Sequence, residues 1–334
     1  MPSNYDLTHK KILITGATGL IGGAVARRLL ADGHAVRVLA RDPARAGDLP
    51  RLGAEVVRGD ILDLASLRVA VAGCPIVIHC AGAINLFEDA QVYRRINAEG
   101  SNNICQAALE AGVERVVYTS TLFVHGVAPA TGVNETFPMK PCGDPYVDTK
   151  IEGEQIAQKW GAKGLPVVVV RPGEVYGPRD NTWTVTPFNL FKRNLMTYAD
   201  SGRGLIQPIY IDDLVEGYLA ALEKGQVGEA YLLLNAEPVE IRHFFGYYAR
   251  MLGKKWTPSG PKVVGMTGAA LFEKLAKLTG KPPIFTRAQV MFTTVRVSYS
   301  GKKAADQLGF VPKTTLEAGM RQTEAWLRSE GYLK

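Results

Sequence analysis

Tyr146 and Lys150 are the two residues whose types and spacing most narrow the chemistry open to this chain. Four residues apart on a helix, their side chains would share one face, about 5–6 Å apart at Cβ. A phenol with a pKa of about 10 is a weak acid or base at neutral pH, and a nearby ammonium favours the phenolate and lowers that pKa. Tyrosine and lysine are common, so the pair alone could also be an ordinary exposed helix face. The segments around it decide between the two interpretations.

Residues 11–23 follow the pattern of a strand, a glycine turn and the start of a helix. Residues 12–14 form a short apolar run, as expected of a buried parallel strand, and residues 24–31 have the spacing of an amphipathic helix. Such a turn brings the backbone close to a pyrophosphate, towards which the free N–H groups of the helix point. The spacing is G-x-x-G-x-x-G rather than G-x-G-x-x-G. The segment predicts a dinucleotide site formed by Gly16, Thr18, Gly19, Leu20, Ile21 and Gly22.

A second predicted strand, residues 35–40, ends at Arg41. A carboxylate at this point would bind the ribose 2′-hydroxyl of NAD, whereas an arginine suits the 2′-phosphate of NADP. Because Asp42 follows directly, and because Arg41 could be a solvated loop charge, the pattern leaves both cofactors open and favours NADP(H) over NAD(H).

Residues 116–126 form a third signal, a buried strand that ends in Thr119, Ser120 and Thr121. Together with the glycine turn and the Tyr–Lys pair, it resembles the extended short-chain dehydrogenase/reductase family, the NAD-dependent epimerase/dehydratase superfamily. Further matches follow in the same order over almost the whole chain, at residues 59–63, 79–82, 97–102, 170–178 and 208–214. The end of the second strand, residues 36–43, is most similar to the dihydroflavonol reductase and 3β-hydroxysteroid dehydrogenase branch.

The resemblance implies a role for each matching residue. Tyr146 would be the acid or base at the substrate oxygen, Lys150 would hold the nicotinamide ribose and lower the pKa of Tyr146, and Thr121 would hydrogen-bond the same oxygen. Ser120 could share or exchange the role of Thr121, and Asn97 is expected to position a helix. The other implied cofactor contacts are Asp60 and Ile61 at the adenine, Cys80, Ala81 and Gly82 near the riboses, and Pro172, Gly173 and Val175 at the nicotinamide amide.

Strands and helices alternate from residue 11 to about residue 171, which predicts an α/β fold with a doubly wound parallel sheet of the Rossmann type. The pattern breaks after Pro178 and returns at about residues 206–235. We therefore predict a dinucleotide-binding domain of residues 1–178 and 205–236. Residues 179–204 and 237–334 would form a smaller, mostly helical substrate-binding domain. By analogy with relatives, helices near residues 93–111 and 146–160 would pair two copies into a homodimer.

Composition fits a globular protein: the 334 residues are 46% hydrophobic and 21% charged. Residues 1–10 lack the apolar core of a signal peptide, and the apolar stretch at residues 69–87 is interrupted by Gly73 and Pro75, so no transmembrane segment is expected. Four cysteines and five histidines show no metal-ligand spacing, which predicts no metal and free thiols in a reducing cytoplasm.

A net charge of +7 could indicate nucleic-acid binding. However, no run of Lys/Arg is longer than doublets such as Lys254-Lys255, so nucleic-acid binding is not expected. Residues 263–278 form an amphipathic helix with two lysines. Such a helix could make a peripheral membrane contact, whereas a lid that packs its apolar face over the substrate cleft or core is favoured.

The residues after Thr121 narrow the reaction. Nucleotide-sugar 4,6-dehydratases of the family carry an Asp-Glu pair there, whereas this chain has Leu122 and Phe123, so dehydration is not expected and an apolar substrate is indicated. We predict an NAD(P)-dependent oxidoreductase that interconverts a secondary alcohol and a ketone on a fairly apolar small molecule. The alternatives are a nucleotide-sugar epimerase with tightly bound NAD and a non-catalytic dinucleotide-binding regulatory protein.

Overall fold

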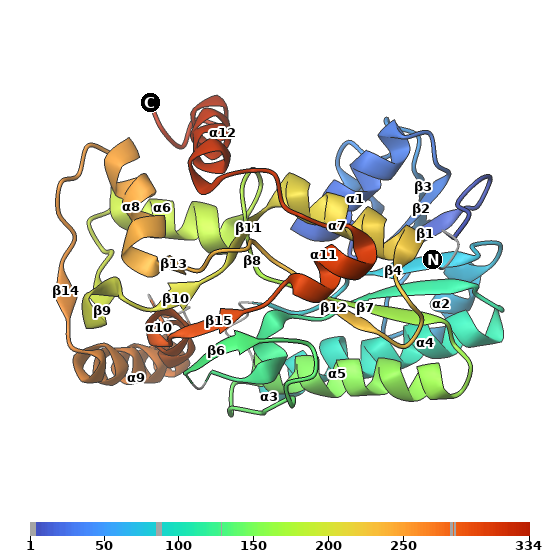
Figure 1. The fold of residues 1–334 in the computed structure, drawn as a ribbon, viewed down its shortest axis with the longest axis horizontal. Coiled ribbons are helices and arrows are strands. Elements are labelled where there is room, and N and C mark those ends of the chain that lie inside the picture. The colour runs from blue at the N-terminus through green and yellow to red at the C-terminus, as the bar shows by residue number, and fades with distance from the viewer. Residues whose placement is uncertain (1–4, 85–88, 128, 281–282, 284) are drawn as a thin grey trace.

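One parallel sheet of seven strands organises the molecule (Figure 1). The computed structural model describes residues 5–334 except 85–88, 128, 281–282 and 284. The strand order is β12-β7-β5-β4-β1-β2-β3, and every neighbouring pair is parallel. The strands are β1 (Ile12–Thr15), β2 (Val36–Ala40), β3 (Glu55–Arg58), β4 (Ile76–His79), β5 (Arg115–Thr119), β7 (Val167–Pro172) and β12 (Ala230–Leu233). The predicted doubly wound sheet is confirmed.

Helices cover both faces of this sheet (Figure 1). On one face, α1 (Leu20–Ala31) packs against α7 (Ile211–Lys224). On the other, α4 (Gly100–Glu110) lies between α2 (Leu64–Val71) and α5 (Pro145–Ala162). The short helix α3 (Ala90–Arg94) and a π-helical turn, Arg95–Glu99, lead into α4.

Side chains of each strand enter the apolar clusters on the two faces of the sheet alternately, because successive side chains point to opposite faces. Ile12 and Ile14 of β1 are buried in the apolar cluster that includes residues of α1 and α7, and Leu13 between them is buried in the cluster with residues of α2 and α4. Full burial of each such side chain contributes about 1.5–3 kcal/mol to folding. The sheet is therefore a rigid platform whose strand ends can hold a site.

The remaining elements form a mostly helical region beside the carboxyl ends of the strands. Its helices are α6 (Thr186–Lys192), α8 (Ile241–Met251), α9 (Lys262–Thr279), α10 (Arg287–Thr294) and α12 (Leu316–Ser329). Its short strands pair as β8 (Glu174–Tyr176) with β11 (Pro208–Tyr210), β9 (Tyr198–Ala199) with β14 (Ser259–Gly260), and β10 (Leu205–Ile206) with β13 (Val239–Glu240). Single turns of 3-10 or π helix occupy Pro43–Ala46, Leu122–His125, Asn181–Val185 and Asp200–Gly202.

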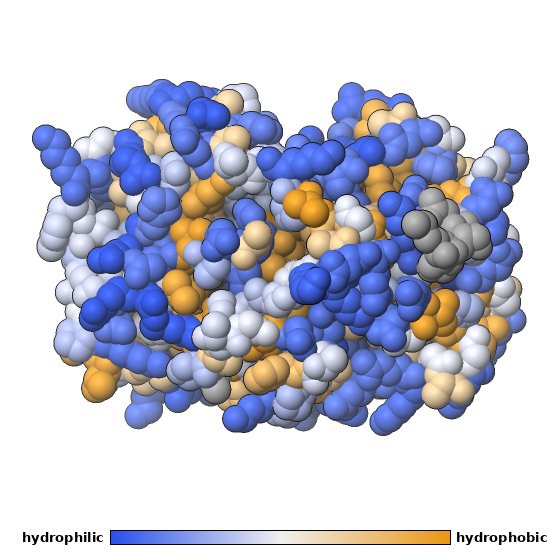
Figure 2. All heavy atoms as spheres, viewed as in Figure 1, coloured by the Kyte–Doolittle hydropathy of each residue, from blue (hydrophilic) through white to orange (hydrophobic). Residues whose placement is uncertain are grey.

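Part of the C-terminal chain returns to the sheet. β15 (Val297–Tyr299) pairs with β6 (Ala130–Val133), and α11 (Lys302–Leu308) packs against α7 and β12. Ala304, Leu308 and Phe310 are buried there in the same apolar cluster as the helices of that face. In Figure 2 hydrophilic side chains cover most of the viewed face, and apolar side chains show near its centre.

The orientation of α9 differs from the favoured prediction, in which the apolar face of this helix packs as a lid over the substrate cleft or core. Only Ala269 and Ala276 of this helix are buried, whereas the large aliphatic residues Val264, Leu271 and Leu278 are exposed. The small residues let α9 approach its neighbours closely, so the larger side chains face outward.

No helix in the described part of the chain is long and apolar enough to cross a bilayer. The four cysteines, Cys74, Cys80, Cys105 and Cys142, form no disulfide. Among the described residues, no three side chains of His, Cys, Asp or Glu lie together as metal ligands would.

Candidate active site

The glycine turn between β1 and α1 is shaped by close backbone contacts. Gly16 has φ of 73°, in the left-handed region that favours glycine, and a Cβ there would lie 2.5 Å from the backbone nitrogen of Ala81. A Cβ at Gly22 would lie 2.6 Å from the carbonyl oxygen of Gly16. Helix α1 begins after Gly19 without a side-chain cap and has no acidic residue in its first turn. Its first N–H groups therefore remain available to an anion, as a pyrophosphate site requires.

A cavity of about 370 Å³ opens beside this turn, over the carboxyl ends of β1, β2, β3 and β4. Its lining brings together residues predicted from four separate segments of the chain. These are Gly16, Thr18, Gly19, Arg41, Asp60, Ile61, Cys80, Ala81 and Gly82. Parallel strands place their carboxyl ends at one edge, which is where open α/β sheets bind nucleotides.

The other predicted cofactor residues lie outside this lining. Leu20, Ile21 and Gly22 form the first turn of α1. Pro172 ends β7, Gly173 follows it, and Val175 lies in β8. A Cβ at Gly173 would lie 2.5 Å from the carbonyl oxygen of Gln207, so the backbone is tightly packed at this point.

Arg95 is a cavity residue that the motifs did not identify. It lies in the π-helical turn before α4 and lines the same cavity as Arg41, with Val92 and Ile96. Arg95 belongs to none of the quoted motifs, although the neighbouring Asn97 does. Only the packing of this turn over the sheet edge brings the two arginines to one cavity.

Tyr146 and Lys150 both lie in the first half of α5. Asp144 caps this helix by accepting a hydrogen bond from Val147 N at 3.1 Å, and Pro145 occupies the first turn. Lys150 is buried and its Nζ donates to the carbonyl oxygen of Thr119 at 2.6 Å. The pair therefore faces the end of β5, where Thr121 lies.

Burial controls the pKa values of the pair. It raises the pKa of Tyr146 to about 12, against the hydrogen bond with Thr121, which lowers it. It lowers the pKa of Lys150 to about 8, against the attraction of Glu154, which raises it. The expected lowering of the Tyr146 pKa is not what the structure gives, because removal of the phenol from water outweighs the other interactions. At neutral pH Tyr146 thus carries its proton.

The two hydroxyl candidates have different partners. Thr121 interacts with Tyr146 and begins the 3-10 turn Leu122–His125, where its Oγ1 accepts from Phe123 N at 3.4 Å. Ser120 is buried and its Oγ donates to the carboxylate of Glu154. The structure therefore places Thr121, and not Ser120, beside the phenol.

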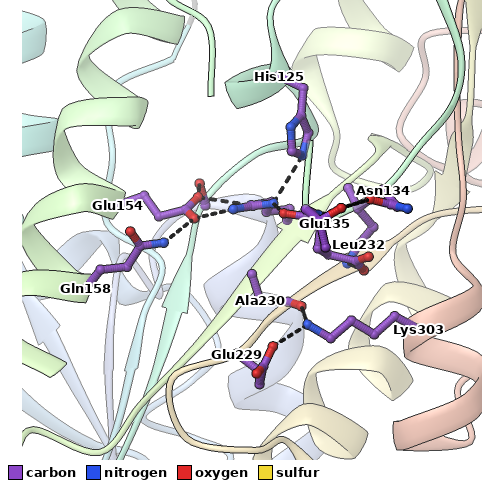
Figure 3. A network of polar contacts seen from close by, with 12 residues as sticks. His125, Asn134, Glu135, Glu154, Gln158, Glu229, Ala230, Leu232 and Lys303 are labelled. Atoms are coloured by element: carbon purple, nitrogen blue, oxygen red, sulfur yellow. Dashed lines mark hydrogen bonds and ion pairs between the residues drawn. The ribbon is translucent and has the colours of Figure 1, made fainter. Parts of the chain in front are cut away.

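A buried ion pair ties the elements of this region together (Figure 3). Arg171, at the end of β7, donates to Glu154 of α5 through Nη2 at 2.6 Å and Nε at 3.2 Å. Its Nη1 lies 3.1 Å from Nε2 of His125, and burial lowers the pKa of this histidine to about 4, helped by the charge of Arg171. Gln158 also donates to Glu154, at 3.1 Å. The network joins the helix with the Tyr–Lys pair to the strand that leads into Gly173.

Asn97 is also held in place by buried hydrogen bonds. Its Oδ1 accepts from Ala83 N at 2.7 Å, and its Nδ2 donates to Ala83 O at 3.2 Å and to Thr149 Oγ1 at 3.1 Å. These bonds connect the cavity wall to α5.

Apolar side chains occupy the positions after Thr121. Leu122 is buried, and the ring of Phe123 lies 4.6 Å from the ring of Phe292 in α10, measured between centroids. Phe123, Phe292 and Tyr146 all pack against one apolar cluster. No carboxylate occupies positions 122 and 123, where elimination of water would need one.

Comparisons with known proteins agree with this architecture. The chain is 28% identical to a putative dihydroflavonol 4-reductase of Synechocystis, over 96% of this chain and 95% of that protein. It is 29% identical to a 3 beta-hydroxysteroid dehydrogenase/Delta 5-->4-isomerase of Mycobacterium tuberculosis, over 93% and 89%. It is also 27% identical to a farnesyl-dihydroquinoline-oxide ketoreductase of Stigmatella aurantiaca, over 93% and 94%.

Solved structures share the fold. The crystal structure of gox2253 is 29% identical and superposes with a TM-score of 0.79, over 97% of this chain and all of that one (100%). The dTDP-glucose 4,6-dehydratase DesIV of Streptomyces venezuelae, solved with NAD bound, gives a TM-score of 0.80 at 24% identity, over 97% and 99%. The second match supports the fold alone. The profile of the NAD dependent epimerase/dehydratase family matches residues 12–233, so the chain belongs to this family of extended short-chain dehydrogenases/reductases.

Proposed function

We propose that this protein is an NADP(H)-preferring oxidoreductase that interconverts a ketone and a secondary alcohol on a fairly apolar small molecule. The observation that carries the proposal is the convergence of Tyr146, Lys150 and Thr121 at the end of β5, beside a glycine-lined nucleotide cavity. Reductases and dehydrogenases among the relatives support the reaction class.

The close backbone contacts at Gly16 and Gly22 fit a dinucleotide site, because they give the tight strand-to-helix turn that lets the backbone approach a pyrophosphate. When bound, the nicotinamide supplies the hydride that adds to the carbonyl carbon, or accepts it in the reverse direction. Gly16, Thr18 and Gly19 would hold the phosphates, and Asp60 with Ile61 the adenine. Pro172, Gly173 and Val175 would offer backbone groups to the nicotinamide amide.

Tyr146 would donate its proton to the substrate oxygen as the carbonyl is reduced, and would recover it from solvent afterwards. The raised pKa suits this direction, since the phenol is protonated at neutral pH. Thr121 would donate a hydrogen bond to the same oxygen and hold it beside the phenol. Lys150 would hold the ribose, and its positive charge would favour the phenolate after proton transfer.

Two arginines support a preference for NADP(H). Arg41 and Arg95 both line the cavity and, within the described residues, neither has a carboxylate partner. Asp42, which left the choice of cofactor open, instead accepts a hydrogen bond from Ala44 N at 3.1 Å and caps the following 3-10 turn. Two arginines that line one cavity suit a 2′-phosphate better than a hydroxyl group.

The cofactor proposal can be tested by titration with NADPH and NADH, followed by fluorescence. Arg41→Ala/Arg95→Ala should weaken NADPH binding roughly 10- to 100-fold, as expected for charged hydrogen bonds, and leave NADH within about threefold. Arg94→Ala is the matched control, because the neighbouring Arg94 instead pairs with Glu99 and Glu152. NAD that stays bound through purification, with no response to NADPH, would contradict the proposal and favour the epimerase.

The catalytic proposal can be tested with Tyr146→Phe. A 3β-hydroxysteroid with NADP⁺ and the matching ketone with NADPH serve as probes, together with smaller apolar ketones. The variant should lose at least ~100-fold in kcat while it binds NADPH as the wild type does. Unchanged turnover would remove Tyr146 from its role. Absence of turnover in the wild type with every probe would favour the non-catalytic binding protein.

We also propose that two copies pair through α4 and α5. A shallow groove on the outer surface of these helices, lined by residues such as Asn102 and Ile156, would lie in that interface. A monomer mass by light scattering at micromolar protein would contradict this homodimer.

A further inference from the structure

Helix α9 presents an apolar stripe to solvent. Val264, Leu271, Leu275 and Leu278 are spaced by seven, four and three residues, which places them within an arc of about 60° on one helix face. Leu271 is 58% exposed and Leu278 is 83% exposed, whereas Ala269 and Ala276 on the opposite side are buried. Four large aliphatic residues on one exposed face are more than the scattered apolar residues of an ordinary surface.

Positive charge is concentrated around the same helix. Residues 254–287 contain six lysines and Arg287 against a single acidic residue, Glu273, so this segment carries +6 of the net charge of +7. The lysines are separated by other residues, so no run longer than a doublet marks them. Glu273 is paired with Arg287, whose Nε lies 2.8 Å from its Oε2. Lys262, Lys274 and Lys277 of α9 are exposed, and among the described residues no carboxylate lies within ion-pair distance of them.

We propose that α9 is a docking surface for an anionic lipid layer. The aliphatic stripe would enter the boundary between headgroups and acyl chains, and the exposed Lys274 and Lys277 of the same helix would bind lipid phosphates. A second copy of the chain fits this surface less well, because pairing two such helices would bring their lysines together without acidic partners. Nucleic acid would use the lysines but would leave the aliphatic stripe in water.

The position of α9 connects this surface with the site. Helix α9 packs on α10, whose Phe292 contacts Phe123 beside Thr121. Both helices lie at one end of the molecule, away from the edge strand β3 (Figure 1). In Figure 2 apolar side chains show at the corresponding lower left edge. If the proposed function is correct, docking would place the apolar side of the site near the lipid layer, where apolar substrates concentrate.

The proposal can be tested by flotation of the full chain with vesicles of phosphatidylcholine alone or with about one third phosphatidylserine. We expect binding to the anionic vesicles at low ionic strength, little binding to the neutral ones, and loss of binding in high salt as the lysine contacts are screened. Lys274→Gln/Lys277→Gln should weaken binding by about fivefold per lysine. Leu271→Gln/Leu278→Gln should weaken it at least tenfold.

Matched controls use similar residues elsewhere on the surface. Val69→Gln/Val311→Gln replaces two exposed apolar residues outside α9, and Lys159→Gln/Lys313→Gln replaces two exposed lysines. Both should bind vesicles as the wild type does. All variants should retain NADPH binding, which separates a failure of docking from a failure of the proposed enzyme.

Two results would overturn the proposal. One is no binding to anionic vesicles at low salt, and the other is equal loss of binding in the control and α9 variants. If the first result came with a dimer by light scattering that Leu271→Gln/Leu278→Gln converts to monomer, the stripe would belong to the contact with a second copy.

Discussion

Helices α5 and α9 have the same length of 18 residues and differ in the side chains that they bury. α5 buries Lys150 and Glu154 in its packed face, whereas α9 buries only two alanines and exposes leucines. Burial of charge costs free energy unless partners are supplied, and α5 has them in Thr119 O, Ser120 and Arg171. α9 has no covering element over its apolar stripe among the described residues.

The contrast separates two ways in which a helix departs from the usual pattern of apolar inside and polar outside. In α5 the departure is compensated within the chain, by hydrogen bonds that hold the Tyr–Lys pair against β5. In α9 no residue of the described chain compensates it, so the partner of this helix is expected outside the chain. Departures of this kind are expected at functional surfaces rather than in the rest of a fold.

The largest effect is expected from breaking the buried pair on α5. Glu154→Leu would leave the guanidinium of Arg171 buried without its carboxylate, and should lower the free energy of unfolding by about 3–5 kcal/mol in urea titrations. Glu154→Leu/Arg171→Met should recover much of this loss, because no guanidinium is then left buried without its carboxylate.

The matched control is Glu317→Leu, which breaks an exposed ion pair with Arg321 on α12 and should change stability little. If the pair serves to position the site, the double variant should regain stability while turnover stays low. Full recovery of both would mean that the pair has no positioning role.

A second prediction concerns pH and Lys150. In the unfolded chain a lysine keeps its proton up to its ordinary pKa of 10.5, whereas buried Lys150 loses it near 8. Between these values the unfolded state binds more protons, so the free energy of unfolding should rise with pH over this window. At pH 7 the buried ammonium should lower the free energy of unfolding by up to about 3 kcal/mol.

The measurement compares the wild type with Lys150→Met between pH 7 and 10. The difference in unfolding free energy should move in favour of the wild type as pH rises, since ionisation of other groups is common to both. A constant difference would show that Lys150 is not desolvated in the folded protein.

The smallest effects are expected on α9. Ala269→Leu should destabilise by about 1–3 kcal/mol, because the added side chain has no space in the packed face. Leu278→Ala on the exposed face should change stability by no more than about 0.5 kcal/mol. Thermal unfolding of both variants tests this orientation. If Leu278→Ala lowered the stability more than Ala269→Leu, the orientation of α9 would be the reverse.

Much of the fold and of the cavity beside the glycine turn could be predicted because the signals are local. A buried strand, a glycine turn and a helix start within about a dozen residues, and parallel strands bring such turns to one edge. Gly16, Asp60 and Ala81 therefore line one cavity. Arg95 was missed because it lies in none of the motifs, and its position depends on how the turn before α4 packs.

The sequence by itself determined the alternation of strands and helices, the shared face of Tyr146 and Lys150, and the existence of an apolar stripe on α9. Only the tertiary structure decided that Ser120 binds Glu154, that Asp42 caps a turn instead of lining the cavity, and that the stripe of α9 faces outward. The physical reason is that periodicity along a chain records which residues share a face. What that face meets depends on elements distant in sequence, and is settled by packing, burial and the pairing of charges.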